Sequence, residues 1–254
     1  MKIFETHAHL YMKDFDKDRD TLIEKCLKND VEYIMNIGVD VESSLKSIQL
    51  AKKYKNLYCS IGFHPHDADK YNEKFILDNL KDSNVLAIGE IGLDYYRNLS
   101  PKNIQIDVFR KQIELALKND MPIIIHDRDA HKDCFDILDE YGANKVVFHS
   151  FSGDEIFAEA VIKKGWFIAF NGIITFKKNT LENVVRMVPQ DKFFVETDSP
   201  YLSPHPNRGK RNSPLNLKYI IEKIADIKQI APKNVAKLSY ENAINFFQIG
   251  KLRK

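Results

Sequence analysis

Residues 2–10, KIFETHAHL, place two histidines at the end of a short apolar run. The run begins at Ile3 and is rich in residues that favour a β-strand, in which successive side chains point to opposite faces. His7 and His9 are two residues apart, so their imidazoles share one face and can bind one metal ion together. Taken alone, an HxH pair fits two surface histidines equally well. Its meaning therefore depends on the rest of the chain.

Short apolar runs like this one recur along the whole sequence. Most are rich in Ile, Val and aromatic residues, and near-continuous apolarity is typical of parallel strands that are buried on both faces. The predicted strands are residues 3–7, 33–37, 57–63, 85–90, 123–126, 145–149, 166–170 and 193–196.

Between the strands lie segments whose apolar residues recur at helical spacing. Leu45, Ile48 and Ala51 form one predicted stripe, and a clearer one runs through residues 217–225. Strands that alternate with helices and connect by right-handed crossovers form either a closed barrel or a doubly wound open sheet. No Gly-rich phosphate loop occurs at a strand-to-helix turn, so a dinucleotide-binding fold has no support. A length of 254 residues is ordinary for one TIM barrel.

The bulk composition excludes several classes of protein. The net charge is +2 with 29% charged residues, so the chain is not polybasic and a nucleic-acid site would need locally concentrated cations. Cys26, Cys59 and Cys134 are far apart, which argues against a disulfide framework or a zinc knuckle. The N-terminus has no apolar leader, and no stretch is long enough to span a membrane. We therefore expect a cytoplasmic protein that is not membrane-bound.

Metal-binding side chains stand at the carboxyl ends of the predicted strands. In a barrel these ends converge on one rim. Carboxylates and imidazoles do not gather there by default, because a buried charge is costly unless it is paired or bound to metal. The predicted metal ligands are His7, His9, Glu90, His126, His149 and Asp198.

Four imidazoles and two carboxylates suit Zn, Mn, Fe, Co or Mg rather than copper(I) or an iron–sulfur cluster. Six ligands exceed one tetrahedral site with an open position. They fit two divalent ions about 3.5–4 Å apart with one bridging carboxylate. Glu90 is the expected bridge, because it lies midway in the barrel order. One ion would take His7, His9 and Asp198 and the other would take the remaining two histidines; Mg, Mn and Zn all stay open.

Longer blocks of the sequence resemble the TatD-type metal-dependent deoxyribonucleases of the amidohydrolase superfamily. The blocks are ETHAHL (5–10), IGFHPHDA (61–68), AIGEIGLDYYR (87–97), PIIIHDRDA (122–130), VFHSFSGD (147–154) and FFVETDSPYLSPHPNRGKRNSP (193–214). They occur in order and span nearly the full length. The sequence shows no linker or second composition zone, which predicts a single α/β domain over residues 1–254. The resemblance implies that this domain is a TIM (β/α)8 barrel with a divalent metal centre.

The resemblance also implies an activity. It is the hydrolysis of DNA phosphodiester bonds, often as a 3′ to 5′ exonuclease that acts on single strands or 3′ ends. The family usually has Asp where this chain has Glu5, a residue that we expect to support the ligands at most. We expect the protein to be a monomer.

The expected catalytic residues are Asp198, Glu90 and His64. A bound divalent ion can lower the pKa of water to about 7. Asp198 is the expected base that orients this water and accepts its proton. The family motif makes His64 a substrate-side or proton-transfer residue, although backbone hydrogen bonds could instead fix its ring. For His66 the second interpretation is preferred, and His131 is expected to be solvated.

The substrate-binding candidates are aromatic and basic residues near the strand ends. Tyr95 and Arg97 follow Glu90, and an aromatic ring beside a cation can stack a base and hold a phosphate. Packing of a tyrosine against the barrel top is the competing interpretation. Arg128 would bind phosphate or pair with a neighbouring aspartate. Arg208 lies in the basic loop 199–212, SPYLSPHPNRGKRN, and is the preferred phosphate ligand against a solvated loop arginine.

Two other functions stay open. One is a different binuclear amidohydrolase that acts on a small ester, amide or phosphoester. Many such enzymes bridge their metals with a lysine at the fourth strand, where this chain has Glu90. The other is a non-catalytic metal-binding or nucleic-acid-binding module on the same fold, since barrels host many functions. The presence of all six ligands argues against that module.

Overall fold

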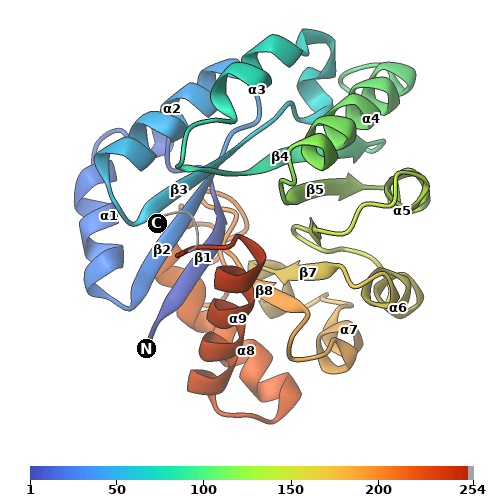
Figure 1. Ribbon diagram of the computed structural model, residues 1–254. Coiled ribbons are helices and arrows are strands. Elements are labelled where there is room, and N and C mark those ends of the chain that lie inside the picture. Colours follow the sequence, from blue (N-terminus) through green and yellow to red (C-terminus); the bar gives the residue numbers. More distant parts are fainter. Residues whose placement is uncertain (251–254) are drawn as a thin grey trace.

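A computed structural model describes residues 1–250, and within them eight parallel strands pair in chain order around one barrel (Figure 1). The ring is closed where Ala8 bridges Ser199 and the Asp198 N–H donates to the His7 carbonyl at 2.9 Å. The predicted TIM barrel is thereby confirmed. The strands are β1 (Ile3–Ala8), β2 (Val31–Ile37), β3 (Leu57–Ile61), β4 (Val85–Asp94), β5 (Ile123–Arg128), β6 (Val146–Phe148), β7 (Phe167–Phe170) and β8 (Phe193–Val195).

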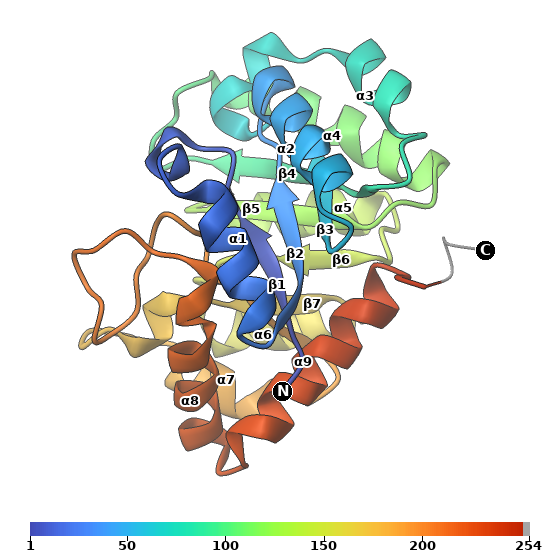
Figure 2. The same cartoon turned by 90° about the vertical axis from the view of Figure 1, so that its left-hand side faces the viewer.

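Helices cover the outside of the barrel (Figures 1 and 2). None of those in residues 1–250 has both the length and the apolarity to cross a bilayer. The α-helices are α1 (Arg19–Lys28), α2 (Val41–Lys53), α3 (Glu73–Asn79), α4 (Lys102–Lys118), α5 (His131–Glu140), α6 (Glu155–Lys163), α7 (Glu182–Met187), α8 (Leu217–Lys228) and α9 (Pro232–Phe246). Short 3₁₀ helices are η1 (Lys13–Phe15), η2 (Pro65–Lys70), η3 (Gly172–Thr175) and η4 (Pro214–Asn216).

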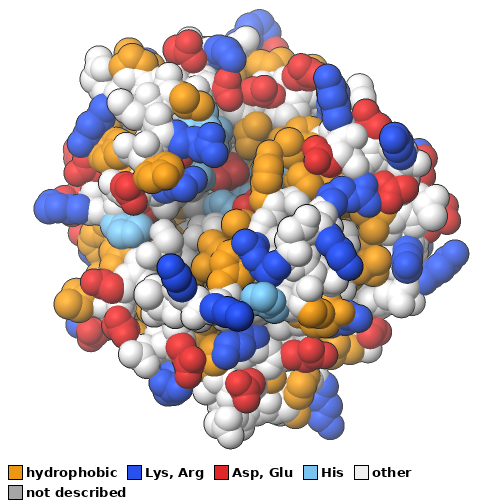
Figure 3. Space-filling model, turned by 180° about the vertical axis from the view of Figure 1, so that it is seen from behind, with side chains coloured by type: hydrophobic (Ala, Val, Ile, Leu, Met, Phe, Trp, Pro, Cys, Tyr) orange, Lys and Arg blue, Asp and Glu red, His pale blue; other side chains and the backbone are white. Residues whose placement is uncertain are grey.

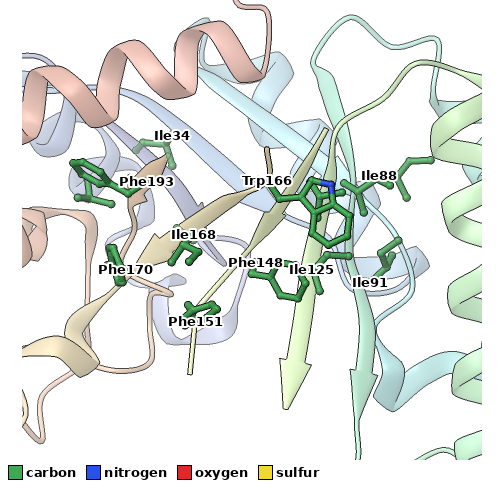
Figure 4. Close-up of a cluster of buried hydrophobic side chains, with 14 of the residues drawn as sticks. Ile34, Ile88, Ile91, Ile125, Phe148, Phe151, Trp166, Ile168, Phe170 and Phe193 are labelled. Atoms are coloured by element: carbon green, nitrogen blue, oxygen red, sulfur yellow. The ribbon is translucent and has the colours of Figure 1, made fainter. Parts of the chain in front are cut away.

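The core has two parts, because each strand is buried on both faces. On β5, Ile124 belongs to the cluster inside the barrel, whereas Ile123 and Ile125 belong to the layer between barrel and helices. Figure 4 shows part of that outer layer, with Ile125 among its side chains. Successive strand residues alternate between these two sides. The next inward position after Ile124 is therefore His126, which is why a ligand at the strand end faces the barrel axis.

Helix α9 closes the end of the barrel at which the strands begin (Figure 1). The Phe247 ring lies 5.8 Å from Phe4 and 6.0 Å from Phe194, near the starts of β1 and β8. Phe246 packs on Phe194 at 5.3 Å. With this end covered by apolar packing, the opposite end is the one available for a site.

Two local expectations need correction. The predicted strand 85–90 runs on to Asp94. On α2, Leu45 is 42% exposed, and the buried face contains Ser44 and Ser47 as well as Ile48 and Ala51. The helix start lies so close to β2 that a Cβ at Gly38 would stand 2.8 Å from the Ser44 Cα, so small residues are needed on this face. The three cysteines are free and buried, as predicted.

Candidate metal centre

The predicted ligands meet at the carboxyl ends of the strands. A cleft of about 680 Å³ opens there, lined by Glu90, His126, His149 and Asp198 among others. His7 lies fully buried next to them. Figure 3 views the molecule from this side and shows a hollow whose floor carries histidine and acidic side chains, bordered by Lys, Arg and hydrophobic side chains. The fold therefore brings the residues that were predicted at the strand ends into a single site.

Glu90 lies between two groups of histidines. Its Oε2 is 3.4 Å from His7 Nε2 and 3.9 Å from His9 Nε2. Its Oε1 is 2.7 Å from His126 Nδ1 and 3.1 Å from His149 Nε2. One carboxylate thus presents a separate oxygen to each group, which is the arrangement that a bridging ligand requires.

The first group consists of His7, His9 and Asp198. Asp198 Oδ1 lies 3.3 Å from His9 Nε2 and 3.8 Å from His7 Nε2. Two ligands that each stand about 2.1 Å from one tetrahedral ion are about 3.4 Å apart. The three side chains therefore have the spacing of ligands around a shared ion.

His7 provides an independent test of whether a cation fits. Both of its ring nitrogens are buried, and neither has a hydrogen-bond partner among the described residues. Leaving a buried polar atom unpaired is costly. A cation facing Nε2, between the oxygens of Glu90 and Asp198, would satisfy that atom.

The second group holds Glu90, His126 and His64, which was expected as a substrate-side or proton-transfer residue and not as a ligand. His64 Nε2 is 3.8 Å from Glu90 Oε1, and its Nδ1 accepts the His66 N–H. His149 faces the same oxygen of Glu90 while its ring stacks on His7 at 3.6 Å. The structure thus adds His64 as a candidate ligand of the second ion.

Two carboxylates that sequence reasoning missed hold the ligand rings. Glu196 Oε1 is 3.1 Å from His149 Nδ1, and Asp94 Oδ2 is 3.2 Å from His126 Nε2. Such partners orient a metal-bound imidazole and set its tautomer. The available signal was their place in the sequence: Glu196 stands two residues before Asp198, and Asp94 ends the longer β4.

His66 is held differently from what was expected. A carboxylate fixes its ring, because His66 Nε2 lies 2.7 Å from Asp94 Oδ2, and the side chain lines the cleft. His131, which was expected to be solvated, keeps 34% of its side chain exposed, while its Nδ1 lies 2.6 Å from Asp127 Oδ2 and its ring stacks on Phe157 at 4.8 Å.

The surroundings favour the protonation state of a metal ligand at Glu90, Asp198 and His7, whereas the facing carboxylates outweigh burial at His126 and His149 and raise the pKa of both imidazoles. Burial raises the pKa of Glu90, but His149 and His126 outweigh it and hold the pKa well below its ordinary value. Burial also raises the pKa of Asp198, and the hydrogen bond with His9 lowers it overall. Burial lowers the pKa of His7. Two carboxylates and a neutral imidazole are therefore the favoured forms.

Glu5, the departure from the family pattern, ties two ligand-bearing strands together. Its Oε1 accepts the N–H groups of His7 at 3.1 Å and Thr197 at 2.9 Å, and its Oε2 accepts the Thr197 hydroxyl at 2.6 Å. Burial raises the pKa of Glu5 to about 8. The Glu5 side chain thus supports the ends of β1 and β8. Its two oxygens accept hydrogen bonds from His7 and Thr197, so Glu5 is a supporting residue and not a candidate metal ligand.

The substrate-binding candidates fall into two sets. Arg97 and Arg128 line the cleft, and the Arg128 guanidinium lies 4.1 Å from the Tyr96 ring. Tyr95 instead donates to Asp133 at 2.7 Å. Tyr95 is not among the residues that line the cleft.

Arg208 also lies outside the cleft lining. Its guanidinium stacks on Phe176 at 3.7 Å and donates to the Ser203 carbonyl at 3.1 Å. The basic loop that carries Arg208 therefore folds on itself here, and the cleft arginines come from the ends of β4 and β5.

Comparison with known proteins adds the family. The family described as TatD related DNase matches residues 4–248. A relative from Bacillus subtilis, the uncharacterized metal-dependent hydrolase YabD, is 40% identical over 253 residues, which cover 97% of this chain and 99% of that protein. The uncharacterized metal-dependent hydrolase TatD of Mycobacterium tuberculosis is 30% identical and covers 98% of this chain and 99% of its own.

Solved structures of similar proteins share the barrel fold of this chain. The TatD homologue YjjV from Escherichia coli superposes with a TM-score of 0.92 at 24% identity, covering 97% of this chain and 98% of its own. A hydrolase TatD family protein from Entamoeba histolytica gives a TM-score of 0.88 at 25% identity, over 97% of this chain and 98% of its own. The match over nearly all of the chain and the metal-ligand geometry lead to the same result: the chain belongs to the TatD related DNase family and is a metal-dependent hydrolase.

Proposed function

We propose that the chain hydrolyses DNA phosphodiester bonds with two divalent ions, as a 3′ to 5′ exonuclease acting on single strands or 3′ ends. One observation carries the two-ion part: Glu90 presents Oε2 to His7 and Oε1 to His126. A carboxylate so placed is suited to bridge the ions of a two-metal hydrolytic site. The family description supports the choice of DNA as substrate.

The two groups of side chains divide the ligands between the ions. His7, His9 and Asp198 would hold one ion, and His126 would hold the other together with His149 or His64. Ions bound there would lower the pKa of water and stabilise negative charge on the attacking and leaving oxygens. Mg, Mn and Zn are all compatible with these imidazole and carboxylate ligands.

Asp198 is the proposed base. Its side chain lies at the edge of the first group, is 13% exposed to the cleft and stays a carboxylate because its pKa is lowered. It is therefore able to orient the attacking water and accept its proton. His64 stands on the other side of Glu90, where it would contact the substrate or take the place of a ligand.

Arg97 and Arg128 support a phosphate-bearing substrate. Both line the cleft that contains the ligands, and they come from neighbouring strand ends. A guanidinium presents a planar fork of donors that matches two phosphate oxygens. A small neutral amide or lactone would offer these two cations no anionic group to bind.

The test uses protein stripped of metal and then supplied with Mg²⁺, Mn²⁺ or Zn²⁺, with single-stranded DNA labelled at either end. We expect metal-dependent loss of nucleotides from the 3′ end. Glu90→Gln should lower the rate by at least about 100-fold, the scale for removing a group that stabilises developing charge. It should also lower the number of bound ions. The control is Glu159→Gln, an exposed carboxylate on α6 that pairs with Lys163. Hydrolysis of a lactone or amide with no cleavage of DNA would overturn the proposal.

A further inference from the structure

A second cavity, of about 430 Å³, lies beside the metal cleft. It is formed by the segment between β1 and α1 and by the exposed side of α2. Tyr11 lines both the cavity and the cleft. The Tyr11 hydroxyl is 3.3 Å from Nδ1 of His9, so a single side chain separates the cavity from a metal ligand.

The lining of this cavity is strongly basic. Lys13, Arg19, Lys46 and Lys53 contribute four cations, and Asp16 contributes one carboxylate. Lys46 and Lys53 pair with Glu42 and Asp20, which are outside the lining. These pairs are exposed, and exposed ion pairs stabilise a protein by only about 0–1 kcal/mol. An anion in the cavity could therefore recruit both lysines at little cost.

Arg19 makes the cavity a built feature of the fold. Its guanidinium group donates to the carbonyls of Leu10, Tyr11 and Met12 at 2.6–3.1 Å and pairs with Asp16 at 2.5 Å. These bonds hold the segment after β1 that carries Tyr11 against the start of α1. The wall between the cavity and the metal cleft is thus fixed.

We propose that this cavity is a phosphate-binding subsite for a ligand whose other end lies in the metal cleft. This proposal rests on the proposed function for the identity of the bond that is cleaved. The phosphate belongs either to the backbone of a strand that continues past the metal centre or to a free phosphate compound. Lys13, Lys46 and Lys53 are the residues assigned to it, because they line the cavity and lie outside the metal centre, and the test replaces the first two.

The decisive variant is Lys13→Gln/Lys46→Gln in the metal-loaded full chain. The matched control is Lys74→Gln/Lys132→Gln, which removes two exposed lysines outside the cavity. Each of them pairs with an aspartate four residues away on its helix, and Lys46 pairs in the same way with Glu42. Binding is measured by fluorescence anisotropy at several salt concentrations. The probes are a phosphorothioate-linked single strand, which resists hydrolysis, and inorganic pyrophosphate as a competitor.

For a strand about ten nucleotides long, each lost phosphate contact lowers the slope of log K against log salt by about 0.7. The decisive variant should lower this slope by about 1.4 and weaken binding about 5-fold per contact at 0.1 M salt, while the control leaves both unchanged. That result identifies a strand. Pyrophosphate binding that disappears in the variant, with the strand slope unchanged, identifies a free phosphate compound.

If neither probe distinguishes the variant from its control, the subsite proposal is overturned. Failure of the proposed function would give a different experimental result from failure of the subsite proposal. In that case the wild-type chain cleaves no phosphodiester bond, whereas the binding comparison, which needs no turnover, still decides whether the cavity binds phosphate.

Discussion

Replacing Gly92 by alanine should separate β4 from β5 at the point where His126 is held. Gly92 pairs with His126 in the parallel ladder and has φ +144°. A Cβ added there would stand 1.9 Å from the His126 carbonyl oxygen and 2.9 Å from its carbonyl carbon. Real Cβ atoms do not approach backbone this closely. The strand that carries the candidate metal ligand His126 must therefore move.

The free energy of unfolding should fall by about 2–6 kcal/mol, the sum of two contributions. A side chain forced into a sparsely populated backbone region costs about 1–3 kcal/mol. Overpacking against a rigid neighbour adds about 1–3 kcal/mol. In a chain of this size each kcal/mol lowers Tm by about 2–4 °C, which gives a loss of about 10 °C.

Gly142→Ala is the control, because Gly142 also has a positive φ, +64°, but has no atom within 4 Å of the added Cβ. This change should cost only the left-handed backbone penalty of about 1–2 kcal/mol. The assays are thermal unfolding by circular dichroism and metal content by elemental analysis. Gly92→Ala should bind fewer ions than the control. Equal Tm values and equal metal content for the two variants would falsify the close-approach argument.

Three further predictions concern the site and the core. Glu196→Gln should weaken metal binding about 10–100-fold by removing the partner that orients His149, as measured by calorimetric titration; an unchanged affinity would refute that role. Arg97→Ala should raise KM for DNA and leave metal content unchanged, whereas Arg208→Ala should change neither; a larger effect of Arg208→Ala in steady-state kinetics would reverse this assignment. Phe247→Ala should cost about 3–5 kcal/mol in denaturant unfolding while the folded protein keeps its kinetic constants, and a smaller loss would argue against the role of α9 in closing the barrel.

Much of the site could be read from the sequence because the barrel turns chain order into spatial order. An apolar run that ends in a polar residue shows where a parallel strand stops, and all such ends reach one rim. His126 and His149 needed no other information, since strand periodicity points both of them inward from Ile124 and Val147. The pattern also predicted Glu90 as the bridging residue, and both of its oxygens face histidines in the structure.

Only the tertiary structure decided which groups support the ligands. The Asp94 carboxylate reaches His126 from another strand, and Glu196 reaches His149 across 47 residues of sequence. Such contacts depend on strand register, and the β4–β5 ladder shifts between Ile88 and Ile91. A shift of register changes which side chains share a face.

The dependence on tertiary contacts also explains why the sequence misplaced Arg208. Its charge and its loop marked it as a phosphate ligand, but its guanidinium stacks on Phe176, whose loop follows a different strand. The sequence by itself determined where the strands lie and most of the candidate metal ligands, because these depend on local pattern. Orientation toward or away from the cleft depends on packing between segments that are distant in the chain, and that was decided by the folded barrel alone.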